Sequence, residues 1–379
     1  MTNQQSGKVI KLSPNLGEKP MNVLSLFDGM SGTQLALKKL GIKVDKYYAS
    51  EIDKYAIKVT NAQTNFPNTI QLGDVKLVKE KLKDTHIDLI TMGSPCQDLS
   101  FSSHNKLGLD GERSGLFFYG IDIIAQQLAI NPNLKVLVEN VRMTKANQDR
   151  MTKALSDVMG QVIEPVAINS NIFSAQNRYR LYWTNLSIPT LPKDKGIVMK
   201  DILETNVDSK YLAGENLLKN YVGGNQLNPN YKSQANTIHD HSKKGPTLCA
   251  GTHGYAIGYI ANNYFKYGNM EKLFNMELKY SKDGLCHVGN ADLNGQDAIK
   301  RVYHANGKSP TLTTMQGGHR EPKVYIENLK YRKLTPLECE RLQTVPDNYT
   351  NHVSNTQRYK MLGNGFTIDT ICHILTELK

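Results

Sequence analysis

The sequence is poor in cysteine, and the spacing of its cysteines excludes several classes of protein. Five cysteines occur among 379 residues, and no two of them form a Cys-x-x-Cys pair. An odd number of scattered thiols does not fit a disulfide framework or a structural zinc site. Each thiol is therefore either a small core residue or a reactive group, and we expect no bound metal. The five are Cys96, Cys249, Cys286, Cys339 and Cys372.

Long apolar runs are missing as well. No segment approaches the roughly 20 apolar residues of a transmembrane helix. The opening residues, MTNQQSGKVIKLSPN, contain no apolar stretch of the signal-peptide type. Hydrophobic residues still make up 39% of the chain, which is enough for a sizeable core. We therefore expect a cytoplasmic protein with no membrane contact, and the length predicts two domains.

Acidic residues are outnumbered by basic ones. The chain has 46 Lys and Arg residues against 35 Asp and Glu residues, a formal net charge of +11. This excess fits a polyanionic partner, most simply nucleic acid. A lysine-rich solvated surface produces the same balance, so the charge alone leaves both interpretations open.

The first half of the chain alternates short apolar runs with helical patterns, which predicts βαβ units and a parallel sheet. Beyond Pro189 the apolar periodicity fades, and helical patterns return only near the end of the chain. The expected strands are 22–27, 46–51, a third ending at Asp74, 87–91, 135–141, and two more that complete the sheet by Leu186; the expected helices are 33–40, 53–64 with Asp53 as N-cap, 115–129, 334–345 and 361–378.

A glycine turn, Asp28-Gly29-Met30-Ser31-Gly32, joins the first expected strand to the first helix. Glu51 ends the next strand 22 residues after Gly29, close to the spacing at which a carboxylate takes ribose hydroxyls, and Asp74 ends the third. The G-x-G-x-x-G fingerprint of dinucleotide sites is missing, and an acidic Asp28 would repel a pyrophosphate. An adenosine without phosphates, as in S-adenosylmethionine, fits better, although Asp28 could instead cap a helix.

Reactive side chains are expected at the same edge of the sheet, where ligands bind beyond the carboxyl ends of the strands. Cys96 follows the fourth strand, in the stretch IDLITMGSPCQDLSFSS, and Glu139 ends the fifth. Arg178 and Arg180 come just before a later strand. A thiol, a carboxylic acid and two guanidinium groups beside a nucleoside cofactor form a coherent chemical set. A core position is the alternative for Cys96.

The ordered series of these segments resembles that of the DNA (cytosine-5) methyltransferases of bacterial and phage type. The resemblance runs through nearly the whole chain, with a variable segment between QNRYR and RKLTP. It rests on FDGMSG (27–32), SEID (50–53), GDV (73–75), SPCQDLS (94–100), ENV (139–141), QNRYR (176–180), RKLTPLECERLQTVP (332–346) and GNGFTI (363–368).

The resemblance implies an α/β fold, in which an S-adenosylmethionine-dependent methyltransferase of Rossmann-like parallel sheet carries a second, smaller target-recognition domain. The implied division is a tail (1–20), a catalytic domain that binds S-adenosylmethionine (21–189), a target-recognition domain (190–345) and a C-terminal segment that returns to the catalytic domain (346–379).

The resemblance also implies a covalent mechanism. The Cys96 thiolate would attack C6 of a cytosine flipped out of duplex DNA, which activates C5 to take a methyl group. Glu139 would hydrogen-bond the ring, and Arg178 and Arg180 would hold the base, the phosphate or the loop of Cys96. The implied cofactor-binding residues are Phe27, Asp28, Gly29, Gly32, Glu51, Ile52, Asp74, Val75, Pro95 and Asn364, and the implied DNA contacts are Gln97, Ser100, Gln176, Thr313 and Arg320.

The chain departs from the family pattern at two places. Ser94 stands where the family most often has proline. GNGF, at residues 363–366, stands where the family usually has GNS or GNA followed by valine. The second departure puts a side-chain contact with the cofactor in doubt at Gly365 and leaves that role to Asn364.

The variable segment contains an internal echo. Its two Pro-Thr-Leu units begin at Pro246 and Pro310, 64 residues apart. They are either paired recognition elements or two similar hairpins that pack the small domain. As recognition elements they would place base contacts at residues 313–320, with phosphate contacts from Lys243, Lys244 and Lys308.

Other functions remain open beside DNA methylation. An RNA cytosine-5 methyltransferase would share the fold, but the long segment 190–331 favours DNA because it can supply a recognition domain. A non-catalytic relative would only bind DNA, which the intact Cys96 and Glu139 disfavour. A nicotinamide oxidoreductase is the generic α/β alternative. We expect a monomer that acts on double-stranded DNA in a restriction-modification or phage DNA-protection context, with a cognate restriction endonuclease as a candidate partner.

Overall fold

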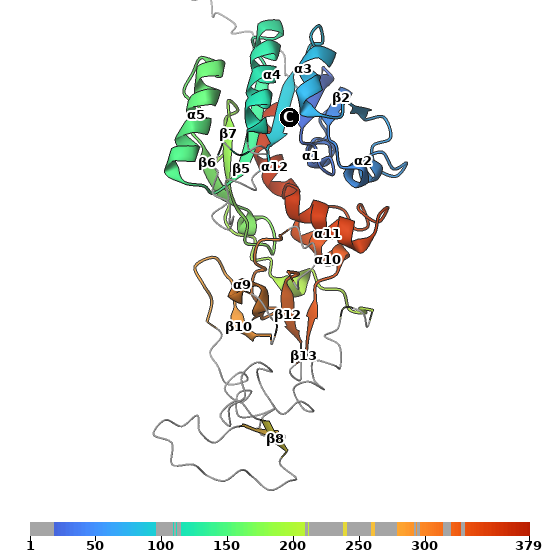
Figure 1. Cartoon of the computed structure of the whole chain (residues 1–379), viewed down its shortest axis with the longest axis vertical. Coiled ribbons are helices and arrows are strands. Elements are labelled where there is room, and N and C mark those ends of the chain that lie inside the picture. Colours follow the sequence, from blue (N-terminus) through green and yellow to red (C-terminus); the bar gives the residue numbers. More distant parts are fainter. Residues whose placement is uncertain are drawn as a thin grey trace, which may run out of the picture.

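A mixed seven-stranded sheet forms the centre of the protein, in the order β3-β2-β1-β4-β5-β7-β6 (Figure 1). The computed structural model describes residues 19–95, 109, 111, 115–208, 211, 238–240, 259–261, 279–291, 293, 296–313, 320–326 and 330–379. The strands of the sheet are β1 (Met21–Leu26), β2 (Val44–Ser50), β3 (Ile70–Gln71), β4 (Leu89–Gly93), β5 (Lys135–Val141), β6 (Val166–Asn169) and β7 (Tyr179–Thr184).

The first five strands are parallel, as the sequence predicts, and β7 runs antiparallel to both of its neighbours. Strands β1, β4 and β5 are buried almost throughout, because a parallel strand covered on both faces needs a continuous apolar run. Since the parallel strands share a direction, the segments that follow β1, β2, β4 and β5 emerge at one edge, and β7 enters at that edge.

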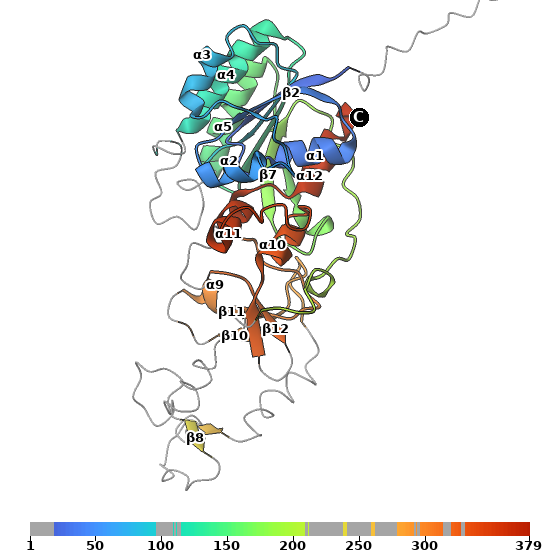
Figure 2. The same cartoon turned by 90° about the vertical axis from the view of Figure 1, so that its right-hand side faces the viewer.

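Helices cover both faces of the sheet (Figure 2). On one face, α4 (Leu116–Ile130) and α5 (Lys145–Met159) pack over apolar side chains such as Leu24 and Val138. The short α3 (Val78–Lys81) lies beside α4 on this face. The buried Trp183 of β7 donates its indole N–H to Thr152 of α5 at 2.8 Å, which anchors that helix.

The opposite face is completed by segments from both ends of the chain. Helix α1 (Gly32–Leu40) packs beside α12 (Ile368–Ile374), so the C-terminal segment returns to the first βαβ unit. Helix α2 (Lys54–Thr60) begins at Asp53, whose carboxylate accepts the N–H of Tyr55, which confirms the predicted N-cap. Asp53 also forms an ion pair with Lys360, at 2.6 Å.

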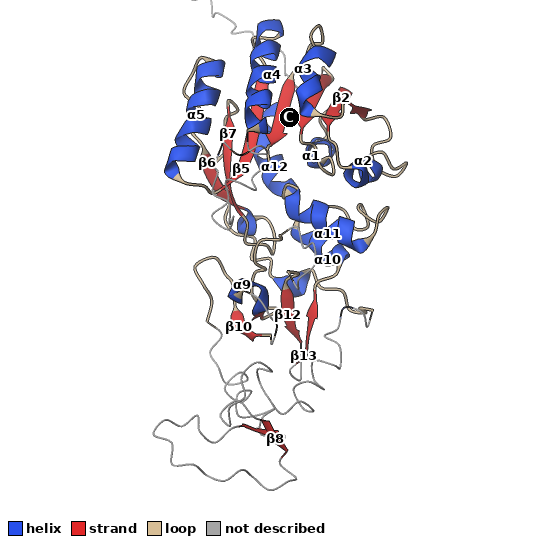
Figure 3. Ribbon diagram, viewed as in Figure 1, coloured by secondary structure: helices blue, strands red, loops and turns tan. Residues whose placement is uncertain are grey.

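A second sheet lies apart from the first, in the order β10-β11-β12-β13 (Figure 3). Its strands are β10 (His287–Asn290), β11 (Arg301–Tyr303), β12 (Lys323–Ile326) and β13 (Lys330–Lys333), with the short α9 (Asp297–Lys300) leading into β11. Earlier in the chain, β8 (Ile238–Asp240) pairs in parallel with β9 (Tyr259–Ala261). These short strands lie in the stretch predicted as the target-recognition domain, and the limits of that domain, residues 190 and 345, stay a prediction.

Helices α10 (Pro336–Leu342) and α11 (Asn355–Asn364) lie between the two sheets (Figure 1). The sequence specifies the start of α10 closely. Pro336 occupies the first turn, and Thr335 and Glu338 form a reciprocal capping box that satisfies two backbone N–H groups. No helix in the described part of the chain is both long and apolar enough to cross a membrane.

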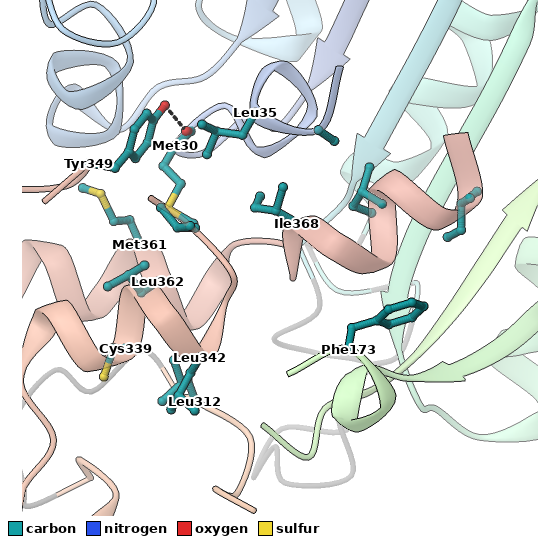
Figure 4. Close-up of a cluster of buried hydrophobic side chains, with 14 of the residues drawn as sticks. Met30, Leu35, Phe173, Leu312, Cys339, Leu342, Tyr349, Met361, Leu362 and Ile368 are labelled. Carbon is teal, nitrogen blue, oxygen red and sulfur yellow. Dashed lines mark hydrogen bonds between the residues drawn. The ribbon is translucent and has the colours of Figure 1, made fainter. Parts of the chain in front are cut away.

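One hydrophobic cluster joins the glycine turn, the C-terminal helices and the edge of the second sheet (Figure 4). Tyr349 belongs to this cluster and donates its hydroxyl to the carbonyl oxygen of Met30 at 2.7 Å. The segments that carry the site are therefore packed on each other rather than strung on separate loops. Labelled members of the cluster are Met30, Leu35, Phe173, Leu312, Cys339, Leu342, Tyr349, Met361, Leu362 and Ile368.

Candidate active site

The turn after β1 is held in an unusual backbone conformation. Phe27, Gly29 and Ser31 all have positive φ angles, of 57°, 57° and 61°. A bulky residue such as Phe27 rarely adopts this conformation, and strain of this kind persists where surrounding contacts enforce it. The turn is held by the bond from Tyr349 to Met30 and by the N–H of residue 28, which donates to Ser50. The result is a rigid, backbone-rich rim at the edge of the sheet.

Glu51 joins this turn to the start of α2. Its Oε2 accepts the N–H of Gly29 at 2.7 Å, and its Oε1 accepts the N–H groups of Ile52 and Asp53 at 2.8 and 2.7 Å. A carboxylate offers about four acceptor positions, so one position on Oε2 is left for a ligand hydroxyl. The neighbouring Ile52 side chain is 75% exposed, an apolar surface suited to the face of a base.

The two residues predicted at the third strand end differ in their surroundings. Asp74 accepts the N–H of Lys76 at 3.0 Å and begins a single 3-10 turn, Val75–Leu77. The Val75 side chain is buried in the core under α4. A carboxylate, an exposed apolar side chain and the glycine turn at one rim make a donor and acceptor set that fits an adenosine ligand.

Asp28 points into the protein rather than out of it. Its two oxygens accept the hydroxyls of Tyr47 and Ser31 at 2.7 and 2.6 Å. Burial raises the pKa of this carboxyl to about 6, in spite of the hydrogen bonds to Ser31, Ser25 and Tyr47, which lower it. These contacts give Asp28 a role in holding the turn from beneath.

Glu139 and Arg180 meet at the next part of the edge. Glu139 is 8% exposed, and its Oε1 lies 3.0 Å from Nε of Arg180. The antiparallel pairing of β5 and β7 sets Val141 opposite Arg180, so the end of one strand meets the start of the other. The guanidinium fixes one carboxylate oxygen and so orients the acid. An oriented, mostly buried acid can hydrogen-bond a ring nitrogen or an amine of a substrate.

Ser94 follows β4 and stands where the family most often has proline, and its hydroxyl has a partner in this structure. The side chain of Asn140, next to Glu139, donates to Oγ of Ser94 at 3.0 Å. This buried bond ties the segment after β4 to the strand that carries the acid. Pro95 follows directly, half-buried. Cys96, Gln97 and Ser100, predicted as the nucleophile and DNA contacts, lie outside the described residues.

Arg178 and Gln176 are both buried, which fits a structural role for each of them better than a direct contact with the base or with DNA. The Arg178 guanidinium donates to the carbonyl oxygens of Gly363 and Gly365 at 3.2 and 2.9 Å. Gln176 is 0% exposed, and its Oε1 accepts the N–H of Leu312 at 3.4 Å. In this arrangement both side chains support neighbouring segments, and a direct DNA contact by Gln176 would require it to leave the interior.

The remaining predicted DNA contacts divide into exposed and buried ones. Thr313 and Arg320 are exposed, on either side of residues that lie outside the described part of the chain. Lys243, Lys244 and Pro246 lie outside it as well. The prediction that Lys308 contacts phosphate is wrong for this structure, because the residue is 3% exposed and its ammonium is bonded within the protein.

Phe366 is the residue that sequence reasoning missed. A Cβ placed on Gly93 would lie 3.0 and 3.1 Å from two atoms of the Phe366 ring, and one on Gly32 would lie 3.3 Å from another. The same position on Gly93 is 3.8 Å from Oε2 of Glu139. The ring therefore packs between Gly32 at the end of the glycine turn and Gly93 at the end of β4, close to Glu139. The only signal for this in the sequence is GNGF itself.

Gly365 makes the complementary change. A Cβ at this residue would lie 2.6 Å from Cε of Met30 in the glycine turn. The small residue thus lets the turn approach, while the large Phe366 fills the space beyond. Asn364, the last residue of α11, is exposed beside them. Among the described residues, no group of three or more His, Cys, Asp or Glu side chains is arranged to hold a metal.

Comparisons with known proteins agree with this geometry. A family model described as C-5 cytosine-specific DNA methylase matches residues 21–379. The orphan methyltransferase M.Rho11sI of Bacillus phage rho11s is 30% identical over 362 residues, covering 81% of this chain and 69% of its own. The type II methyltransferase M.HhaI of Haemophilus parahaemolyticus is 25% identical and covers 93% of each chain. The crystal structure of S. pombe Dnmt2 methyltransferase has a TM-score of 0.58 at 15% identity, covering 94% of this chain and 98% of its own, which supports the fold.

The raised pKa of Asp28 predicts a pH-dependent stability. Because the folded protein binds this proton more tightly than the unfolded chain, the contribution is complete below pH 4 and is lost as the pH rises through about 6. This change in the free energy of unfolding amounts to at most about 3 kcal/mol. Asp28→Asn, which cannot ionise, should gain stability relative to wild type between pH 4.5 and 7.5 in urea unfolding. Asp45→Asn, at an exposed position of β2, is the control, and a pH-independent difference for Asp28→Asn would contradict the assignment.

The packing of Phe366 predicts a coupled pair of substitutions. Gly93→Ala should destabilise the protein by about 1–3 kcal/mol, because the new methyl group meets the ring. In a Phe366→Val background the same change should cost at least about 1 kcal/mol less, as measured by thermal and denaturant unfolding. Gly289→Ala is the control, since a Cβ there meets nothing within 4 Å. Additive effects of the two substitutions would show that the ring does not lie against Gly93.

Proposed function

The chain belongs to the C-5 cytosine-specific DNA methylases, and we propose that it flips a cytosine out of duplex DNA and methylates it through a covalent adduct with Cys96. It is a DNA (cytosine-5)-methyltransferase. The observation that carries the proposed mechanism is the Glu139–Arg180 pair, which lies beside Gly93, three residues before Cys96. This pair supports the proposal, because it sets an oriented acid beside the end of β4, the strand that leads to Cys96.

In the proposed reaction, C5 of cytosine is too poor a nucleophile to react unaided. The thiolate of Cys96 adds to C6, and the electrons of the C5–C6 double bond become available at C5. C5 would then take the methyl group of S-adenosylmethionine, whose sulfonium sulfur would leave as a neutral thioether. The C5 proton would pass to a base, and the thiolate would leave C6 as the C5–C6 double bond re-forms. Glu139, in its protonated form, donates a hydrogen bond or its proton to N3 of the ring, which stabilises the negative charge that builds up there.

Arg180 has a defined part in this scheme. Its Nε contacts Oε1 of Glu139, so the second oxygen, Oε2, is the one available to the base. Removing the guanidinium would leave a mostly buried carboxylate without its charged partner and free to rotate. Arg178, bonded to the carbonyls of Gly363 and Gly365, would act by holding the GNGF segment rather than by touching the base.

We propose S-adenosylmethionine as the cofactor, which supplies an electrophilic methyl group when it is bound. Glu51 would take a ribose hydroxyl with its remaining acceptor position, and Ile52 would cover the adenine. The backbone of Phe27 to Gly32 would line the methionine end. Phe366, which packs against Gly32 and Gly93, would form the wall between the cofactor and the cytosine.

The second sheet and the net charge of +11 support a DNA substrate. Basic residues on the surface would bind phosphates without reading sequence, while exposed side chains such as Thr313 and Arg320 would read base edges. Flipping the base costs a few kcal/mol, which such contacts would offset. Because curated relatives are named as orphan methyltransferases of Bacillus phages and as type II methyltransferases, we propose a role in phage DNA protection or restriction-modification.

The decisive experiment offers labelled S-adenosylmethionine with duplex DNA, with RNA, and with neither. Label in DNA supports the proposal, label in RNA alone would replace it by an RNA methyltransferase, and label in neither would indicate a binding protein. Bisulfite sequencing of DNA from an expressing host then identifies the methylated cytosines.

Cys96→Ser should abolish methyl transfer while cofactor affinity stays within about threefold, because a hydroxyl is a far weaker nucleophile than a thiolate. The readouts are methyl transfer and cofactor titration. In the same assay, DNA with 5-fluorocytosine at the target should form a covalent adduct with wild type and none with the variant. Turnover of Cys96→Ser near the wild-type rate would refute the assignment of Cys96 as the nucleophile.

Glu139→Gln should lower kcat by roughly 10²–10⁴, because an amide keeps a hydrogen bond but cannot supply a proton. Circular dichroism and thermal unfolding should remain close to wild type, since the amide can still face Arg180. Glu164→Gln, at a surface position between α5 and β6, is the matched control. Normal turnover in Glu139→Gln would mean that the acid is only structural.

A further inference from the structure

Lys308 is a buried cation of the variable segment, and its bonds join residues 171 and 174 of the catalytic domain to residues 194 and 197 of the segment that follows it. Its ammonium donates to the carbonyl oxygens of Asn171, Ser174 and Ile197, the first two at 2.8 and 3.2 Å. It also lies 3.1 Å from a carboxylate oxygen of Asp194, whose side chain is partly exposed. A lysine is seldom buried in this way unless its donors are satisfied, so these contacts specify its place closely.

The residues that follow Lys308 form a short parallel bridge to the QNRYR segment. The N–H of Ser309 donates to the carbonyl of Ala175 at 2.6 Å, and the N–H of Asn177 donates to the carbonyl of Ser309 at 2.7 Å. Oγ1 of Thr311 then donates to the carbonyl of Asn177 at 2.6 Å. Three backbone groups, the carbonyl of Ala175 and the N–H and carbonyl of Asn177, are thus held just before Arg178.

Arg178 extends the same junction toward the site. Its backbone N–H donates to the side chain of Asn169 at 3.0 Å, and its carbonyl accepts the N–H of Ser170 at 3.0 Å. Strand β7 begins at the next residue and brings Arg180 to Glu139. The position of the catalytic ion pair therefore depends on a strand whose entrance is held by residues 308–312.

We propose that Lys308 is a positioning residue for methyl transfer, which locks the entrance of β7 so that Arg180 meets Glu139. This inference rests on the proposed function of that pair. It makes residues 308–312, the second Pro-Thr-Leu element, part of the catalytic scaffold. The element thereby links the sheet that carries the exposed Thr313 and Arg320 to the acid at the active site.

The chemistry explains why this position holds a lysine. Three of its four acceptors are backbone carbonyls on two separate segments, around Ser174 and around Ile197, and the three N–H donors of one ammonium can reach both segments. Methionine would fill a similar volume but would leave these oxygens without the donor. The segments would then separate or admit water, and the bridge to residues 175–177 would loosen.

The test compares Lys308→Met with wild type and with Lys282→Met, an exposed lysine of the same segment. We expect kcat per active site to fall at least tenfold, with KM for DNA within threefold, when active sites are counted by covalent trapping on 5-fluorocytosine DNA. The slope of log binding constant against log salt should not change. Hydrogen exchange at residues 175–180, measured without DNA, should become faster only in Lys308→Met.

Two results would overturn the proposal. A slope that falls by about 0.9 would identify Lys308 as a phosphate contact. An unchanged kcat per active site, with only less folded protein, would make the lysine purely structural. If Lys308→Met does not fold, Asp194→Asn serves as the second variant, because it removes the charge of the partner but keeps an acceptor at a partly exposed position. Asp194→Asn should lower kcat two- to fivefold and leave the salt slope unchanged. A wild-type kcat in this variant would count against the proposal. Absence of DNA methylation by wild type would instead refute the proposed function, while the exchange measurement still judges the contact.

Discussion

The site depends on one topological feature, the antiparallel entry of β7 beside β5. A parallel strand at this place would begin at the opposite edge of the sheet, and Arg180 would lie a full strand length from Glu139. The reversal instead sets Arg180 across from Val141. It also means that the segment just before β7 must lie at the crowded active-site edge, where residues 308–312 and the GNGF segment both reach it. The catalytic pair and the junction between the two sheets are therefore consequences of the same reversal.

That junction concentrates buried polar groups, which is costly unless every one is paired. Arg178 bonds to carbonyl oxygens of residues 363 and 365, and Lys308 bonds to those of residues 171, 174 and 197. Their acceptors are mainly backbone oxygens, which cannot move away without distorting the chain. Apolar side chains could hold these segments together with less desolvation, but they would not fix their register. An active site needs its groups held within about half an ångström, and directional bonds supply that.

The sequence predicted the local features of the fold well. The apolar runs gave β1, β4 and β5 to within a few residues, the Asp53 cap was found, and the α/β class is confirmed. These features depend on residues close together in the chain. The reversal of β7, the inward turn of Asp28 and the burial of Lys308 depend on partners 19 to 137 residues away, which no local pattern encodes. A lysine is ordinarily expected at the surface, and the burial of Lys308 becomes clear only from the four acceptors around its ammonium in the structure.

The GNGF segment shows how a departure from a family pattern can be absorbed by its neighbours. Gly365 gives up a side chain where Met30 approaches, and Phe366 gains volume where Gly32 and Gly93 leave room. Each change alone would leave a cavity or a clash, at a cost of about 1–3 kcal/mol. Together they conserve volume, and they put an aromatic wall where the family usually has valine. A substitution that restored only one of the two family residues would therefore unbalance the packing between the cofactor turn and the acid. The effect of either Gly365 or Phe366 on packing therefore depends on the other, and on the residues that the two contact, Met30, Gly32 and Gly93.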